Sequence, residues 1–178
     1  GRYPVSSTDI AMKLAPCINA AGRLEHADIA VRAMSGRDGF VYEVDRLVEL
    51  NEKRKDVSKR IVAEAKERFH SEDGVMKGEW EVGVTSGAAG SLCTSEGRPV
   101  ALAVELEDHI HTTTRAPEGG DVLKCLSNIS DLLMSWGGHK RAAGFSCKKE
   151  NWEEVSERLR EEFAAMEITP PAKAASRS

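Results

Sequence analysis

Residues 136–146 carry the most chemically suggestive spacing in the chain: two glycines, a histidine, two basic residues and then a run of small residues. Gly137 and Gly138 have no Cβ, so they allow a tight turn and a close approach to a ligand. Such a turn offers backbone N–H groups, the His139 imidazole and positive charge to one phosphate. The alternative is a plain turn between a helix and a strand with an incidental histidine, because a short motif alone is weak evidence.

Two other segments carry groups that suit a phosphate. Thr113 and Arg115 lie two apart in a stretch of strand-like composition, so their side chains are expected on one side of a strand. Arg23 lies near the end of a segment interrupted by Pro and Gly, and its planar guanidinium can donate paired hydrogen bonds to phosphate oxygens. Ordinary strand composition and a surface arginine are the alternatives. Because neighbouring elements usually pack together, we expect His139 and Arg115 to share one sheet edge.

The residues that could bind a metal or cleave a phosphoester are sparse. His109 and His111 have the spacing of a bidentate metal pair, but only Glu107 or Asp108 could join them, so we expect no metal site. The aspartates are scattered and form no cluster suited to a two-metal centre. No Gly-x-Ser-x-Gly elbow is present. The sequence therefore predicts a chain that holds a phosphate and contains no catalytic residue of its own.

Composition sets broad limits on the class of protein. The 178 residues are 40% hydrophobic and 30% charged, which suits one domain with an additional helical element and a cytoplasmic location. The net charge of −4 argues against a non-specific nucleic-acid coat but allows a local basic site. No apolar run is long enough to span a bilayer, and no signal peptide is expected. Without an initiator Met, the chain is expected to be part of a longer one.

The four cysteines argue against zinc. Cys17, Cys93, Cys125 and Cys147 form no Cys-x-x-Cys pair, so a zinc ribbon is not expected. They are typical of reduced, mostly buried thiols in a cytosolic protein.

Apolar spacing predicts helices in the first half of the chain. A short helix is expected at about 24–35, ending near Gly36, and a long one at about 38–70. The charge run 52–56 is interpreted as a solvated helix face. A break at 71–74 is followed by an expected strand at 79–84, and a helix rich in small residues is expected to start within 83–92.

The second half alternates between strand and helix patterns. A buried strand at 100–106 is expected to pair with 109–115. Asp121 is expected to cap a helix. That helix is expected to bury five residues at helical spacing, namely Val122, Leu126, Ile129, Leu133 and Trp136. A strand at 142–147 precedes a last helix with a capping box, Asn151 with Glu154, and an apolar stripe from Trp152 to Met166. The aromatic side chains are interpreted as core anchors.

These elements predict an α/β fold, with a mixed sheet of four to five strands flanked by helices and preceded by a long helical interdomain arm. The expected boundaries are 1–70 for the arm, 71–166 for the α/β domain and 167–178 for a disordered tail.

Taken in order, the motifs resemble the C-terminal half of RecJ-like proteins of the DHH phosphoesterase superfamily. Segments 15–24, 79–92, 98–100, 113–115 and 136–146 are each similar to a family segment, and they follow the family's order. The resemblance covers about residues 14–165, and the pattern looks closer to archaeal relatives. Cys17 stands where the family usually has arginine and Glu81 where histidine is common, while Thr113 replaces a serine and keeps its hydroxyl.

The resemblance implies a DHH-associated domain that grips a single nucleic-acid strand. Mn²⁺ or Mg²⁺ is expected in an N-terminal DHH domain outside this sequence, where a metal-activated water would cleave the strand. Arg23, Thr113 and Arg115 would then hold phosphate, and Gly137, Gly138 and His139 would line the cleft. The isolated chain is expected to bind single-stranded DNA or RNA weakly, in a salt-sensitive and sequence-independent manner.

Three other functions stay open. The first is a phosphodiesterase for short oligonucleotides or cyclic dinucleotides, since related DHH proteins share the Gly-Gly-His segment. The second is a non-catalytic replication scaffold that docks onto GINS through a helical face. The third, an RNA-contacting domain appended to an aminoacyl-tRNA synthetase, is disfavoured by segment 15–24.

Overall fold

The chain forms two structural units, which meet within one long helix. The computed structural model describes residues 6–35 and 40–169. The units divide between Arg60 and Ile61. The predicted helix end at Gly36, and positions 170–178 of the predicted tail, lie outside the described residues. Within the described ranges, no helix is long and apolar enough to cross a membrane.

Short helices make up the first unit. It contains α1 (Ser7–Asp9), a π-helical turn (Ile10–Leu14), α2 (Ala15–Leu24), α3 (Asp28–Ser35) and the first part of α4 (Phe40–Arg68). Pro16 lies in the first turn of α2, where its missing N–H costs no helical hydrogen bond. The small core consists of Ala20, Ala21, Ala30, Ala33, Leu47 and Leu50.

Helix α4 confirms the predicted long helix. The charge run on it is solvated as expected: Glu52, Lys53, Lys55 and Asp56 are exposed, and Arg54 is half-buried. Beyond the run, Ile61, Ala65 and Phe69 are fully buried in the second unit.

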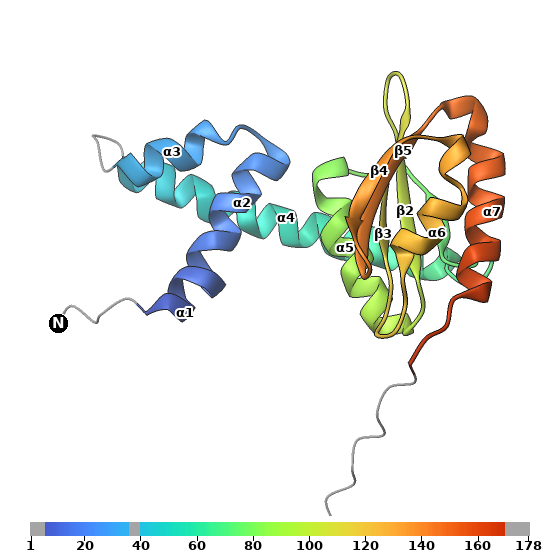
Figure 1. The fold of residues 1–178 in the computed structure, drawn as a ribbon. Coiled ribbons are helices and arrows are strands. Elements are labelled where there is room, and N and C mark those ends of the chain that lie inside the picture. The colour runs from blue at the N-terminus through green and yellow to red at the C-terminus, as the bar shows by residue number, and fades with distance from the viewer. Residues whose placement is uncertain (1–5, 36–39, 170–178) are drawn as a thin grey trace, which may run out of the picture. The chain divides into compact units, whose positions relative to one another are not determined.

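The second unit is a five-stranded mixed sheet between helices, so the predicted α/β class is confirmed (Figure 1). The strand order is β1 (Val75–Lys77), β2 (Val100–Glu105), β3 (Ile110–Arg115), β5 (Ala142–Cys147) and β4 (Leu133–His139). Only the β1–β2 pair is parallel, and its crossover is α5 (Val82–Glu96). Helix α5 covers one face, while α6 (Val122–Asn128) and α7 (Trp152–Ala165) cover the other.

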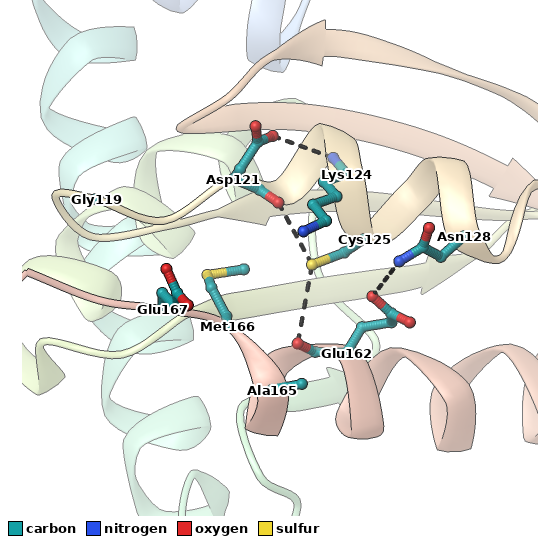
Figure 2. Close-up of a pocket in the computed structure, with 9 residues that line it drawn as sticks. All are labelled: Gly119, Asp121, Lys124, Cys125, Asn128, Glu162, Ala165, Met166 and Glu167. Carbon is teal, nitrogen blue, oxygen red and sulfur yellow. Dashed lines mark hydrogen bonds between the residues drawn. The ribbon is translucent and has the colours of Figure 1, made fainter.

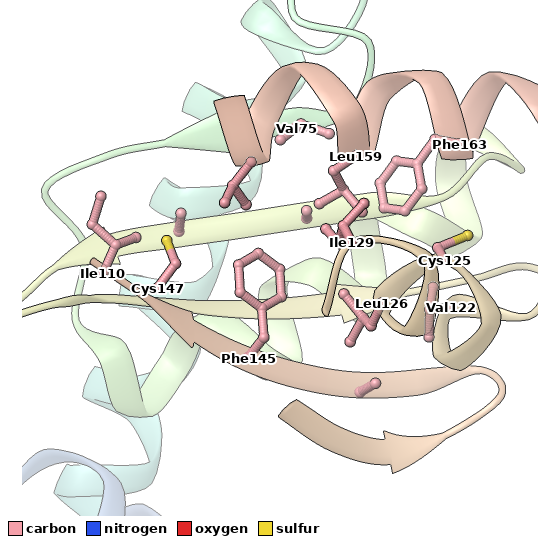
Figure 3. Packing of buried hydrophobic residues seen from close by; sticks show 14 of the residues in the cluster. Val75, Ile110, Val122, Cys125, Leu126, Ile129, Phe145, Cys147, Leu159 and Phe163 are labelled. Carbon is pink, nitrogen blue, oxygen red and sulfur yellow. The ribbon is translucent and has the colours of Figure 1, made fainter. Parts of the chain in front are cut away.

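Aromatic and branched side chains fill the space between the sheet and helices α6 and α7 (Figure 3). Phe145 of β5 lies at the centre of this core, facing Leu159 and Phe163 of α7 and Leu126 of α6. The apolar stripe predicted for the last helix is therefore confirmed, with Trp152, Val155, Leu159 and Phe163 all buried. Asp121 caps α6 as expected, because its carboxylate accepts from Lys124 N.

The strand predicted at 79–84 is wrong. The strand is Val75–Lys77, and Val82 already begins α5. Trp80 lies between them as a linker residue whose indole packs against Gly78 and whose Nε1 donates to Glu64 of α4 at 3.0 Å. Burial of this indole, rather than strand pairing, accounts for the apolar character of the segment.

The helix predicted through Trp136 is also wrong. It ends at Asn128, a 3₁₀ turn (Ser130–Leu132) follows, and β4 begins at Leu133. Trp136 is 41% exposed on this edge strand and is no core anchor. The helical spacing from Val122 was misleading because pairing with β5 satisfies the backbone of 133–139 more fully than isolated helix turns would.

The capping box predicted for the last helix is not formed. Asn151 makes no side-chain capping bond and instead donates to the Leu132 carbonyl at 3.5 Å.

Candidate nucleic-acid interface

Three adjacent strands bring the predicted phosphate-binding groups of the second unit to one end of the sheet. Arg115 of β3 and His139 of β4 both pair with Ala142 of β5, which lies between them. We call these three residues the arginine row. Directly opposite residues of antiparallel strands share a face, so Arg115 and His139 lie on the same face of the sheet. They therefore share one end of the sheet, although Arg115 lies on the central strand and only His139 lies on an edge strand.

A second row lies next to the first on the same face. Thr113, Gly144 and Gly137 pair across the same three strands, and we call them the glycine row. Thr113 is only 5% exposed, whereas Gly137 is exposed and Gly144 half-buried. The two glycines leave the outer part of this row without side chains, which lets a ligand approach the backbone.

The turn lies one step later than the sequence analysis expected. Gly137, Gly138 and His139 end strand β4, and Lys140 and Arg141 form the two-residue turn to β5. Gly138 has φ +140°, and a Cβ there would lie 2.5 Å from the Ala142 carbonyl oxygen. The hairpin therefore requires glycine at 138, because other residues would be strained and would clash.

The Arg115 guanidinium is held between β3 and α5. It donates to Ser86 Oγ of α5 at 2.6 Å and to the Thr114 carbonyl at 3.0 Å. A Cβ added at Gly90, one turn further along α5, would lie 3.7 Å from Arg115 Nε. Helix α5 therefore fixes the direction of the guanidinium and leaves room beside it.

Positive charge gathers around this end of the sheet. The charges of Arg141 and Arg115 both act on Cys93 of α5, where they lower the thiol pKa against a larger upward shift from burial. Lys140 is exposed and lies 3.9 Å from the Asp121 carboxylate. The net charge of the chain is negative, yet this end combines three cations with an exposed histidine. Such a local excess attracts phosphate.

Of the predicted site residues, the structure brings Thr113, Arg115, Gly137 and His139 onto one face, with Gly138 shaping the hairpin. Arg23 is an exposed residue of α2 and belongs to the first unit, so its part in the site stays a prediction.

Sequence reasoning missed Ser86, and it counted Arg141 only as one of two basic residues after the Gly-Gly-His segment. Ser86 lies within a run of small residues that gives no sign of its contact with Arg115. Arg141 could have been named as a site residue from its place two positions after His139.

The side chains that the structure describes do not form a donor set that suits a metal ion. Among residues 6–35 and 40–169, no three His, Cys, Asp or Glu side chains come together in a way that could hold one. His109 instead bonds Asp108 through Nδ1 at 2.6 Å. The pKa of His111 is lowered, first by burial and then by the nearby charge of His109.

A separate pocket of about 470 Å³ lies where α6 meets the end of α7 (Figure 2). Asp121, Glu162 and Glu167 give its wall a negative character that disfavours phosphate. Cys125 bonds the carbonyls of Asp121 and Glu162, and burial raises the pKa of its thiol to about 11. This pocket is therefore not the phosphate site, and its thiol is unreactive at neutral pH.

The fold and motifs agree with a known family. Residues 62–165 match the DHHA1 domain. The chain therefore belongs to the DHHA1 family, and the α/β unit described above is its DHHA1 domain.

Within that family the similarity is to RecJ proteins, as the ordered motifs predicted. The chain is 31% identical over 162 residues to the single-stranded-DNA-specific exonuclease RecJ of Bacillus subtilis, covering 85% of this chain and 21% of that protein. It is 28% identical to RecJ of Thermus thermophilus over 149 residues, covering 81% and 22%. The chain thus spans about a fifth of the length of these relatives.

Solved structures show the same likeness. The crystal structure of RecJ from Thermus thermophilus in complex with Mg²⁺ has a TM-score of 0.80 at 26% identity, covering 93% of this chain and 27% of that one. An exonuclease RecJ bound to manganese has a TM-score of 0.74 at 25% identity, covering 92% and 43%.

Proposed function

We propose that this chain is the single-strand-binding part of a RecJ-like exonuclease and that it grips a backbone phosphate at the arginine row. The observation that carries the proposal is the pairing of Arg115 and His139 with the same residue, Ala142. A guanidinium and an imidazole on one sheet face, next to the two glycines of the glycine row, suit a phosphate that approaches the backbone closely.

Hydrolysis would be the work of another part of a longer protein. The residues described here do not form a metal-ligand set, so no bond-breaking step is assigned to them. Mn²⁺ or Mg²⁺ in a DHH domain would supply the activated water. In this division of labour, Arg115, Thr113 and His139 position the strand, and Arg23 of the first unit would make a phosphate contact of its own.

An apolar groove in the first unit supports contact with that DHH domain. The groove, about 390 Å³ in volume, is lined by Leu14, Ile18, Met34, Val44 and Val48 among others. Exposed apolar surface of this kind marks an interaction site. We expect Met34→Lys to weaken association with a separately expressed DHH region, whereas Lys59→Ala, at an exposed site on α4, should not.

The salt dependence of binding tests the phosphate grip. Fluorescence anisotropy with labelled oligo-dT should show that log K falls by roughly 0.7 per phosphate contact for each tenfold rise in salt. Arg115→Ala should weaken binding about tenfold and remove one contact from the slope. The matched control is Lys124→Ala, which removes an exposed cation from α6 on the other face. Affinity that does not change with salt, or an equal loss in both variants, would contradict the proposal.

A further inference from the structure

A third row of polar side chains continues the same sheet face. His111 of β3 pairs with Ser146 of β5, which pairs with Ser135 of β4. The hydroxyls of Ser135 and Ser146 lie 2.7 Å apart, so both point to the same side. We call these residues the serine row. It is two residues along each strand from the glycine row and four from the arginine row.

The serine row differs from the arginine row in charge. Burial and the charge of His109 lower the pKa of His111, so its imidazole is neutral at pH 7. Ser135 is exposed, and Ser146 and His111 are half-buried. Each hydroxyl can make further hydrogen bonds besides the one between the two serines. The row therefore offers neutral donors and acceptors to solvent or to a ligand.

The glycine row lies between the two polar rows, and we call the strip over Gly137 and Gly144, which bears no side chains, the trough. A Cβ added at Gly137 would meet nothing within 4 Å, so the space above it is open. Thr113 lies in the same row, and its side chain is only 5% exposed. The open space beside Gly137 therefore leaves room for a ligand between the two polar rows.

From these observations, and on the basis of the proposed function, we infer that the serine row is a second subsite, which binds the sugar or base of the nucleotide that follows the one carrying the gripped phosphate. Four residues of strand separate the outer rows by about 13 Å. A single phosphate cannot contact both rows, whereas a strand lying along the trough can. Recognition at the serine row uses uncharged hydrogen bonds, while the arginine row supplies the charge.

The inference predicts that the arginine row binds the phosphate of a short or a long ligand, whereas the serine row adds affinity only for the longer one. The probes are thymidine 5′-monophosphate and the 5′-phosphorylated dinucleotide pTpT, titrated into the ¹⁵N-labelled chain and followed by NMR. The double variant Ser135→Ala with Ser146→Ala should bind pTpT about five- to tenfold more weakly, from the loss of neutral hydrogen bonds. Its affinity for the monophosphate and its salt slope should match those of the unaltered chain.

Ser127→Ala on α6 is the matched control, because it removes an exposed hydroxyl on the other side of the sheet. Amide signals of residues 135 and 146 should shift with pTpT and not with the monophosphate. Undiminished pTpT binding in the double variant, or an equal loss for both probes, would overturn the second subsite and leave the phosphate grip standing. An unaltered chain that binds neither probe would overturn the subsite and the proposed function together.

Discussion

The two faces of the sheet differ in how completely they are covered. The face under α6 and α7 is closed by apolar side chains around Phe145. The face under α5 is apolar over β2, but over β5 and β4 it exposes serines, glycines and a histidine. One strand, β5, contributes to both, because its residues alternate between a buried core position and a half-exposed one. The comparison indicates that one face stabilises the domain and the other is left for a ligand.

The largest expected effect is on stability, and the loss should differ greatly between two neighbouring residues of β5. Phe145→Ala removes a ring that is 3% exposed, so we expect a loss of about 3–5 kcal/mol in the free energy of unfolding. Ser146→Ala, next in sequence but on the other face, should change it by less than about 0.5 kcal/mol. Urea unfolding followed by circular dichroism measures both. Similar losses in the two variants would mean that the faces are not divided in this way.

The two glycines of β4 should respond differently to alanine. Gly138→Ala forces a side chain onto φ +140° and into the Ala142 carbonyl, so we expect it to cost about 1–3 kcal/mol of stability. Gly137→Ala meets no neighbouring atom and should leave the melting temperature nearly unchanged. Its methyl group would instead fill the trough and weaken oligo-dT binding several-fold. A Gly137→Ala variant with full affinity would place the ligand elsewhere.

Arg115→Lys sharpens the distinction between charge and geometry. Lysine keeps the positive charge but loses the fork that bonds Ser86 and the Thr114 carbonyl. The salt slope of oligo-dT binding should therefore be preserved, while affinity falls by roughly threefold to tenfold. Anisotropy titrations at several salt concentrations give both quantities. Full affinity in this variant would show that the guanidinium geometry is unimportant.

The smallest expected effect concerns two buried threonines on the packed face. Thr114 Oγ1 donates to the Ala143 carbonyl at 2.9 Å, whereas Thr112 Oγ1 has no partner among the described residues. Thr114→Val should cost about 1 kcal/mol, and Thr112→Val should be neutral or slightly stabilising. Thermal melts of the two isosteric variants make the comparison. Destabilisation by Thr112→Val would point to a partner such as a buried water.

Local patterns predicted the elements whose contacts lie close in sequence. The long helix, the β2–β3 pair, the Asp121 cap and the last helix all follow from periodicity, β-branched composition or short-range hydrogen bonds. Segment 129–139 was mispredicted because its apolar spacing fits a helix and a strand equally well. Its conformation depends on β5, which follows in sequence and provides the backbone partners.

By itself, the sequence determined the α/β class, the family and the types of residue that could hold a phosphate. Composition, periodicity and motif order are properties of the linear chain and do not depend on which strands pair. Only the tertiary structure decided that Arg115 and His139 flank Ala142, that Ser86 orients the guanidinium and that Ser135 meets Ser146. These contacts depend on strand order and register. A shift of one residue would move every side chain of a strand to the opposite face, so the site exists only once the sheet has formed.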